Sequence, residues 1–307
     1  MKTVLITGGT GLVGSRLTEL LLARNYNVIV LSRSKKETST PNLSYAIWNV
    51  EEQIIDVSVF AKTDYIMHLA GAGVADKRWS VSRKKEILDS RTQSSALLVK
   101  ALQQNSNKVK AVISSSAIGW YGPDPSLHSN GFEETDAPYS DYLGNTCKLW
   151  EESIEPITQQ NIRLVKLRTG IVLSTKGGAL KEFLNPIKMG IAAILGNGKQ
   201  IISWIHIDDL CNQFIYAIEH ENMQGSYNAV APNPVNNRIL TLSIAKKVKG
   251  KFYIPIYVPS FMLKIILGEM SIEVLKSTTV SSKKIEIAGF NFKYKTIDAA
   301  LSNLLNK

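Results

Sequence analysis

Three glycines near the amino terminus have the spacing that a phosphate-binding turn requires. The segment TGGTGLVG, residues 7–14, forms a G-x-x-G-x-x-G pattern directly after the apolar run VLIT. Glycines permit a tight turn and a close approach of the backbone to a pyrophosphate. A helix expected to begin at Leu12 would present its free N–H groups and positive dipole end to that charge. This context favours a dinucleotide site over a turn without a ligand. The predicted contacts of the turn are Gly8, Thr10, Gly11, Leu12, Val13 and Gly14.

The residues that end the second apolar run bear on the choice of nucleotide. An acidic residue there would bind the ribose 2′-OH of NAD, but this chain has Ser32 followed by Arg33, with Lys35 and Lys36 beyond. A guanidinium suits a 2′-phosphate. We therefore predict NADP, with Arg33 at its phosphate; the alternative is NAD beside a solvated basic turn. Trp48, which ends the third run, either flanks the adenine or packs in the core.

Short apolar runs alternate with longer amphipathic stretches in the first half of the chain. The runs are residues 4–7, 27–32, 45–48, 65–70, 110–116 and 163–168, and the stretches 12–24 and 83–104 have helical spacing. This alternation predicts an α/β fold with a Rossmann-type, doubly wound parallel sheet. We predict an NADP-binding domain over residues 1–170, to which later segments such as about 201–220 return. Residues 171–307 are expected to form mainly a smaller C-terminal substrate lobe, over the carboxyl ends of the strands.

The composition bears on the cellular compartment and on the class of molecule that the protein binds. The two cysteines form no CxxC pair, which predicts neither a disulfide framework nor a metal site and favours a reducing cytoplasm. The 36 Lys and Arg residues behind the net charge of +10 are scattered, so we expect a small and anionic partner molecule, not nucleic acid. The best apolar stretch, residues 252–268, is interrupted by two prolines and a lysine, which argues against a membrane span. The oligomeric state is left open.

Motifs over nearly the whole chain resemble those of extended short-chain dehydrogenases/reductases. They are the glycine turn, DYIMHLAGAG at 64–73, ISSSAIGWYG at 113–122, LRTGIVL at 167–173 and WIHIDDL at 204–210. More narrowly, ADKRWS at 75–80, DSRTQSS at 89–95, YNAVAPNPV at 227–235, LGEM at 267–270 and AGFNFKY at 288–294 resemble one subgroup. Its members are labelled NAD(P)-dependent sugar-nucleotide epimerases, and some cell-division-inhibitor-like. The resemblance implies further cofactor contacts at Leu69, Ala70, Gly71, Ser114, Cys147 and Thr169.

In the wider family, a serine and a Tyr-x-x-x-Lys helix carry out proton transfer. The lysine holds the ribose and lowers the pKa of the tyrosine, so the phenol acts as acid or base near neutral pH. Ser116 matches the serine and is therefore a candidate catalytic residue. Tyr121 is a second candidate for a catalytic phenol, although the family usually carries a packing aromatic there.

The segment DYLGNTCKLWEE, residues 141–152, has the place of the Tyr-x-x-x-Lys helix but not its pair. Counted from Tyr142, the lysine position holds Thr146. Glu151 resembles the acidic residue that closes the family motif, and counted from it the pair becomes Leu143 and Cys147. The second register turns Tyr142 about 100° away from the cofactor. Cys147 is then expected to fill the space left by the lysine, and a nucleophilic role would require a depressed thiol pKa.

Basic residues provide candidate substrate contacts. Arg91 stands where the wider family commonly has an asparagine, and Lys77, Arg78 and Trp79 follow the fourth strand, near the expected nicotinamide. We expect these residues to hold an anionic substrate. The alternative for residues 77–79 is a surface loop tied down by its tryptophan.

Four other ionisable residues, His68, His206, Asp208 and Asp209, are expected to be structural. His68, inside the apolar fourth strand, is interpreted as a satisfied core histidine. Asp208 and Asp209 follow His206 where a helix begins, and capping together with the helix dipole explains acidic residues there.

Two functions from different classes fit these observations. The first is an NADP-binding oxidoreductase or epimerase-like enzyme that transfers hydride at nicotinamide C4 to or from a carbonyl or alcohol substrate. The second is an NADP-binding regulatory or scaffold protein without turnover. The missing Tyr-Lys pair favours the second, whereas Ser116 and the polar loop at 77–79 favour the first.

Overall fold

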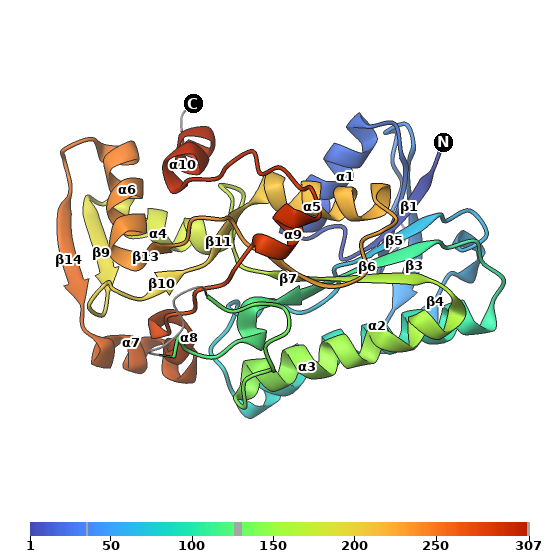
Figure 1. The fold of residues 1–307 in the computed structure, drawn as a ribbon, viewed down its shortest axis with the longest axis horizontal. Helices are drawn as coiled ribbons and strands as arrows, with labels where there is room; N and C mark the ends of the chain where they lie inside the picture. Colours follow the sequence, from blue (N-terminus) through green and yellow to red (C-terminus); the bar gives the residue numbers. More distant parts are fainter. Residues whose placement is uncertain (35, 126–130, 306–307) are drawn as a thin grey trace.

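A central eight-stranded sheet organises the molecule (Figure 1). The computed structural model describes residues 1–34, 36–125 and 131–305. The strand order is β12-β7-β6-β5-β1-β2-β3-β4, and only the β3–β4 pair is antiparallel. The order changes direction at β1, so the carboxyl ends of β1 and β5 form the switch point at which such sheets bind ligands. The strands are β1 (Thr3–Thr7), β2 (Asn27–Ser32), β3 (Leu43–Asn49), β4 (Ile54–Ile55), β5 (Tyr65–His68), β6 (Ala111–Ala117), β7 (Arg163–Thr169) and β12 (Gly225–Ala229).

Helices cover both faces of this sheet. Figure 1 shows α1 and α5 on one face and α2 and α3 on the other. Strand β1 is buried on both faces of the sheet. Val4 and Ile6 join the core on the α1 side, and Leu5 joins the core on the α2 side. This arrangement confirms the predicted doubly wound, Rossmann-type α/β sheet. The helices are α1 (Leu12–Ala23), α2 (Val81–Gln104), α3 (Tyr142–Ile154) and α5 (Ile207–Glu219), with short 3₁₀ turns η1 (Val57–Val59), η2 (Ile118–Trp120) and η3 (Glu155–Gln160).

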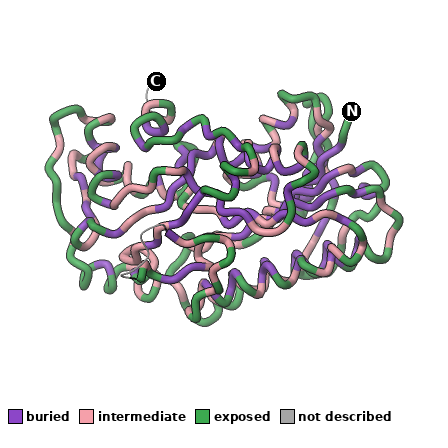
Figure 2. The backbone as a smooth tube through the Cα atoms, viewed as in Figure 1, coloured by how far each residue is buried: buried purple, intermediate pink, exposed green. Residues whose placement is uncertain are grey.

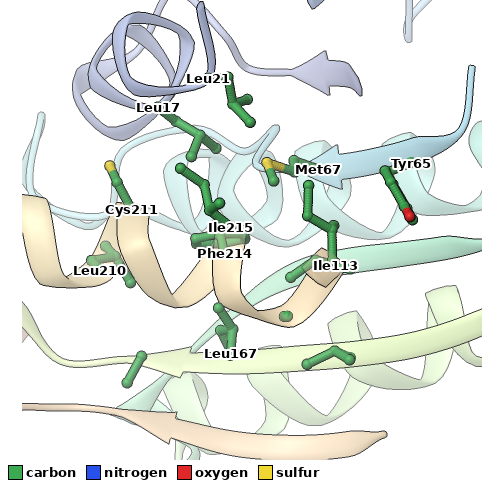
Figure 3. Close-up of a cluster of buried hydrophobic side chains, with 14 of the residues drawn as sticks. Leu17, Leu21, Tyr65, Met67, Ile113, Leu167, Leu210, Cys211, Phe214 and Ile215 are labelled. Atoms are coloured by element: carbon green, nitrogen blue, oxygen red, sulfur yellow. The ribbon is translucent and has the colours of Figure 1, made fainter. Parts of the chain in front are cut away.

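Apolar side chains of α1 and α5 meet in the larger core, on one face of the sheet (Figure 3). Leu17 and Leu21 lie one turn apart on α1, and Phe214 of α5 faces them; all three are fully buried. Each large apolar side chain withdrawn from water contributes about 1.5–3 kcal/mol. Helix α5 therefore belongs to the sheet body, although it follows residue 170 in the sequence.

A smaller lobe begins where β7 ends. Its own core includes Leu180, Leu240 and Ile244 from α4 and α6. Figure 2 shows the sheet largely buried and the outer strand of the lobe, β14, largely exposed. The strands here are β8 (Ile171–Leu173), β9 (Ile191–Leu195), β10 (Ile201–Ile202), β11 (Trp204–His206), β13 (Val235–Asn236) and β14 (Ile254–Val258). The helices are α4 (Ala179–Lys188), α6 (Asn237–Lys249), α7 (Ser260–Leu267), η4 (Gly268–Met270), α8 (Ser271–Leu275), α9 (Lys283–Ile287) and α10 (Ile297–Leu305).

Among the described residues, no helix combines the length and the apolar character that crossing a bilayer requires.

Candidate cofactor and active site

The glycine turn between β1 and α1 is built so tightly that side chains would not fit. Gly8 has φ +67°, and a Cβ there would lie 2.9 Å from the carbonyl carbon of Leu69. A Cβ at Gly14 would lie 2.4 Å from the Gly8 carbonyl oxygen. Gly11 precedes α1 and provides no capping side chain, and the first turn of α1 has no acidic residue. The positive end of α1 is thus left for a ligand's negative charge, as a pyrophosphate cradle requires.

Thr7 and His68 join this turn to the loop that follows β5. The Thr7 hydroxyl accepts hydrogen bonds from the N–H groups of Leu69 and Ala70, at 3.0 and 3.1 Å. Thr7 Oγ1 lies 2.8 Å from His68 Nδ1, and His68 Nε2 lies 3.1 Å from Ser95 Oγ. Burial lowers the pKa of His68 to about 4, so the ring is neutral. His68 is the satisfied core histidine that the sequence predicts, and it braces the carboxyl edge of the sheet.

The end of β2 places the residues expected at the ribose. Ser32 is buried and Arg33 is exposed, and Lys36 lies over the Tyr45 ring at 5.8 Å. Lys35 lies outside the described residues. Trp48 is only 5% exposed and packs edge-on against His68, with 6.4 Å between ring centroids. Packing therefore accounts for the burial of Trp48, and its contact with the adenine stays a prediction.

Ser116 takes part in a buried ion-pair network. Its hydroxyl donates to Glu151 Oε1 at 2.7 Å, and Arg168 binds the same carboxylate through Nε at 2.8 Å and Nη2 at 3.1 Å. Burial alone would raise the pKa of Glu151, but the hydrogen bond and charge of Arg168 outweigh it and hold that pKa below its ordinary value. Because its proton is directed at Glu151, these contacts favour a structural role for Ser116 over the catalytic one.

Tyr121 belongs to the same network. It is fully buried, its hydroxyl donates to Asn228 Oδ1 at 2.7 Å, and Arg168 Nη1 donates to that hydroxyl at 3.0 Å. Its ring stacks on Phe132 at 5.1 Å. Burial raises the pKa of Tyr121 to about 12, so the phenol stays protonated. The packing interpretation of Tyr121 is the one that the geometry favours.

Helix α3 turns Leu143 and Cys147 toward the turn after β6. A Cβ at Gly119, in that turn, would lie 3.3 Å from Leu143 Cβ and 3.5 Å from Cys147 Sγ. This orientation agrees with the register counted from Glu151, and the correspondence of the two residues to the family's Tyr and Lys stays a prediction. Burial raises the pKa of Cys147 to about 12, which leaves it a protonated thiol and a poor nucleophile.

Tyr142 points to a different neighbour. Its hydroxyl donates to the Lys84 carbonyl oxygen at 2.9 Å, and its ring meets Trp79 edge-on at 5.0 Å. Burial raises the pKa of Tyr142, the opposite of what a catalytic tyrosine needs. Tyr142 therefore anchors α3 to the start of α2.

Comparison with known proteins agrees with this architecture. The family model described as "NAD dependent epimerase/dehydratase family" matches residues 4–230. The chain belongs to this NAD dependent epimerase/dehydratase family. A second model, "Domain of unknown function (DUF1731)", matches residues 258–304. The resemblance to extended short-chain dehydrogenases/reductases is thereby confirmed at the level of the family.

Full-length relatives and solved structures extend the comparison. Epimerase family protein YfhF of Bacillus subtilis is 34% identical over 302 residues, covering 98% of this chain and 97% of its own. Epimerase family protein SH2119 of Staphylococcus haemolyticus is 34% identical and covers both chains fully. The crystal structure of human epimerase family protein SDR39U1 with NADPH is 28% identical, with a TM-score of 0.85 and 99% of both chains covered. The MoeE5 complex with UDP-glucuronic acid and NAD, at 18% identity and a TM-score of 0.79, shows the shared fold.

In this epimerase-family chain, the loop after β5 is braced from several sides. Trp79 Nε1 donates to the Val74 carbonyl oxygen at 2.9 Å, and Arg83 Nη2 donates to the Gly73 carbonyl. A Cβ at Gly268 would lie 2.7 Å from Arg78 Nε, so this arginine touches η4 of the lobe. Lys77 and Arg78 are exposed. Trp79 does tie the loop down, as one alternative proposed, and the loop still presents two cations.

Arg91 lies beneath the same loop, almost wholly buried. Its Nη1 donates to the carbonyl oxygens of Ala72 at 3.0 Å and Ile87 at 2.8 Å. Gly71 is exposed at the surface of the loop, and Leu69 and Ala70 are half-buried. Ser114 is buried on β6, and Thr169 is half-buried at the end of β7. Two of the predicted contacts, Gly71 and Arg91, thus meet in the loop after β5, where a Cβ at Gly71 would lie 3.3 Å from Arg91 Cγ.

The acidic residues at the start of α5 have structural partners. Asp208 pairs with Arg16 at 2.7 Å, and Asp209 accepts the N–H groups of Lys293 and Tyr294, both at 2.9 Å. His206 caps the helix by accepting the Asp208 N–H at 3.0 Å. These contacts match the structural interpretation of all three.

Arg168 has a role that the sequence did not indicate. It lies in the motif LRTGIVL, but its partner Glu151 is 17 positions away on a different element. A buried arginine in an apolar strand requires a carboxylate partner, and the acidic residue that ends the α3 motif was the available signal.

Proposed function

We propose that this protein binds NADP(H) across the carboxyl edge of its sheet and transfers hydride between nicotinamide C4 and a small carbonyl or alcohol substrate. The glycine turn carries the proposal: its Cβ clashes and the uncapped start of α1 form a cradle that fits a pyrophosphate. The NADPH bound to human SDR39U1 supports the choice of cofactor. We infer that residues 1–170, with α5 and β12, hold the dinucleotide, and that the lobe binds the substrate.

This chain's own residues would act mainly by binding and orientation. Gly8 to Gly14 hold the pyrophosphate, Arg33 pairs with the 2′-phosphate, and residues 69–71 line the middle of the site. Bound NADPH would supply the hydride. Lys77 and Arg78, on the exposed loop after β5, would attract an anionic substrate. We infer that the proton reaches the reacting oxygen from water or from the substrate, because α3 offers only Leu143 and Cys147 where the family has its acid.

The replacement of the family's acid by Leu143 and Cys147 favours a second candidate function, an NADP-binding regulatory protein without turnover. Cys147 is a protonated thiol and Leu143 carries no acid, so neither of the two residues that α3 turns toward the loop after β6 supports rapid proton transfer. In this alternative, cofactor occupancy would stabilise the fold and order a surface for a partner.

One experiment separates these outcomes. NADPH binding is measured by fluorescence titration. Turnover is followed by loss of NADPH absorbance with 2-oxo acids and simple aldehydes, and by gain of NADPH absorbance from NADP⁺ with UDP-sugars, which are alcohol substrates. Binding with turnover supports the enzyme, whereas binding without turnover on any class supports the regulatory protein. A folded protein that binds neither NADPH nor NADH would overturn both.

A further inference from the structure

Arg91 is a buried cation to which the described residues supply no carboxylate. It is 9% exposed, and its Nη1 donates hydrogen bonds to the backbone carbonyl oxygens of Ala72 and Ile87. Its guanidinium carbon lies 4.9 Å from the centroid of the Trp150 ring, a cation–π contact. Arg168, by comparison, has the Glu151 carboxylate at 2.8 Å. A buried charge without a counterion is costly, and no neighbouring carboxylate among the described residues offsets its effect on what binds nearby.

The surroundings of Arg91 place it at one end of the expected dinucleotide. A Cβ at Gly71 would lie 3.3 Å from both Cγ and Cζ of Arg91, so the side chain packs directly under the loop after β5. Arg33 follows β2, on the other side of the glycine turn. A dinucleotide with its 2′-phosphate at Arg33 and its pyrophosphate at Gly11 would therefore bring its nicotinamide toward β5 and β6.

Arg91 also reaches the helix that carries Cys147. Its guanidinium lies over the ring of Trp150, three residues after Cys147 on α3, and Cys147 itself faces the turn after β6. The resemblance to the family expects an asparagine on α2 where Arg91 stands and a lysine on α3 where Cys147 stands.

We propose that Arg91 supplies from α2 the positive charge that the family's lysine supplies from α3, and that this charge faces the nicotinamide end of the bound dinucleotide. The inference rests on the proposed NADP(H) site and names the residue that sets its electrostatics. The small thiol of Cys147 leaves room for the guanidinium, whereas a lysine there would add a second cation beside it.

The test uses the difference in charge between the two forms of the cofactor. The nicotinamide ring of NADP⁺ is positively charged and that of NADPH is neutral. A nearby cation therefore weakens the binding of NADP⁺ relative to the binding of NADPH. For a unit charge about 10 Å away at an effective dielectric constant of about 20, the effect is roughly tenfold. We expect Arg91→Met to lower the ratio of the NADP⁺ to the NADPH dissociation constant by about tenfold, and Arg91→Lys to keep the wild-type ratio.

A purely structural Arg91 would behave differently. Its loss would weaken both forms of the cofactor equally, and the ratio would stay within about twofold of wild type; that result overturns the inference. If Arg91→Met does not fold, Arg91→Asn combined with Cys147→Lys provides the decisive variant, because it restores the family arrangement. This double variant should bind both forms with the wild-type ratio, whereas Arg91→Asn with Cys147→Met should show the lowered ratio.

The experiment distinguishes failure of the proposed NADP(H) site from failure of the role assigned to Arg91. If wild-type protein does not bind NADPH, the cofactor site itself is wrong. If wild type and variants bind NADPH, and bind 2′-phospho-ADP-ribose equally, but the ratio does not move, only the role of Arg91 is wrong. The analogue lacks nicotinamide, so its affinity should be independent of residue 91.

Discussion

Arg33 decides the nucleotide in our interpretation, and a single substitution tests it. Arg33→Ala should weaken NADPH binding by about tenfold to a hundredfold, equivalent to about 1.5–3 kcal/mol for a lost charged hydrogen-bond partner. NADH binding should change little, because it has no 2′-phosphate. Parallel titrations of both cofactors measure this, with Lys36→Ala as the control, since Lys36 is placed over the Tyr45 ring. Equal affinity of wild type for NADPH and NADH would refute the assignment.

Tyr142 is the residue at which two registers of α3 make opposite predictions. Its hydroxyl bonds the Lys84 carbonyl oxygen, so Tyr142→Phe should cost about 1 kcal/mol of stability and leave NADPH affinity and any turnover nearly unchanged. If Tyr142 were the working acid, turnover would fall by about 10²- to 10⁴-fold. Rate measurements at saturating NADPH discriminate between the two, and a hundredfold loss with cofactor affinity intact would make Tyr142 the acid.

At the scale of elements, two glycines of the turn between β1 and α1 are needed for different reasons: one for packing within the protein, the other to leave room for a ligand. A Cβ at Gly14 would press on the backbone of Gly8 and Gly9, but a Cβ at Gly11 meets only the Gly8 carbonyl oxygen, at 3.3 Å. Gly14→Val and Gly11→Val should therefore both abolish NADPH binding, and Gly14→Val should also lower the melting temperature. Thermal melts beside titrations measure both effects. Tight NADPH binding by a folded Gly11→Val protein would show that the pyrophosphate lies elsewhere.

The long elements could be predicted from the sequence, and the short ones could not. The run 27–32 coincides with β2, and the stretch 83–104 falls within α2. Their apolar residues repeat with the period of a strand or a helix over enough positions to be recognised. Strands β4, β10 and β13 have two residues each, too few for any period, and their pairing depends on distant partners.

At the scale of the molecule, sequence similarity located the candidate site but could not assign the contacts within it. Ser116 matches the family's serine, yet its proton goes to Glu151, 35 residues later. Arg91 is one residue among 36 basic ones until the fold buries it beneath Gly71 in the loop after β5. Such contacts depend on packing between α2, α3 and β6, and no local pattern encodes them.

The buried hydrogen-bond network around Glu151 should make the stability of the whole molecule depend on pH. Glu151 on α3 and Arg168 on β7 pair at 2.8 Å, and Tyr121 and Asn228 extend the network to β12. Glu151→Gln would leave Arg168 buried without its counterion. We expect it to lower the free energy of unfolding by about 3–5 kcal/mol at neutral pH. Glu155→Gln, which removes an exposed carboxylate from Lys166, is the control and should cost less than about 1 kcal/mol.

The sign of the pH effect follows from the carboxylate. The folded-state pKa of Glu151 is held below its ordinary value of 4.5, mainly by Arg168 acting against the effect of burial. Its contribution to stability is therefore complete above about pH 4.5 and is lost as the pH falls through the lower folded-state pKa. Glutamine does not titrate, so the stability gap between wild type and Glu151→Gln should be largest at pH 7 and should narrow below about pH 4.5. Urea unfolding at pH 7, 5, 4 and 3 measures the gap, and a gap independent of pH would show that Glu151 is not ionised in the folded protein.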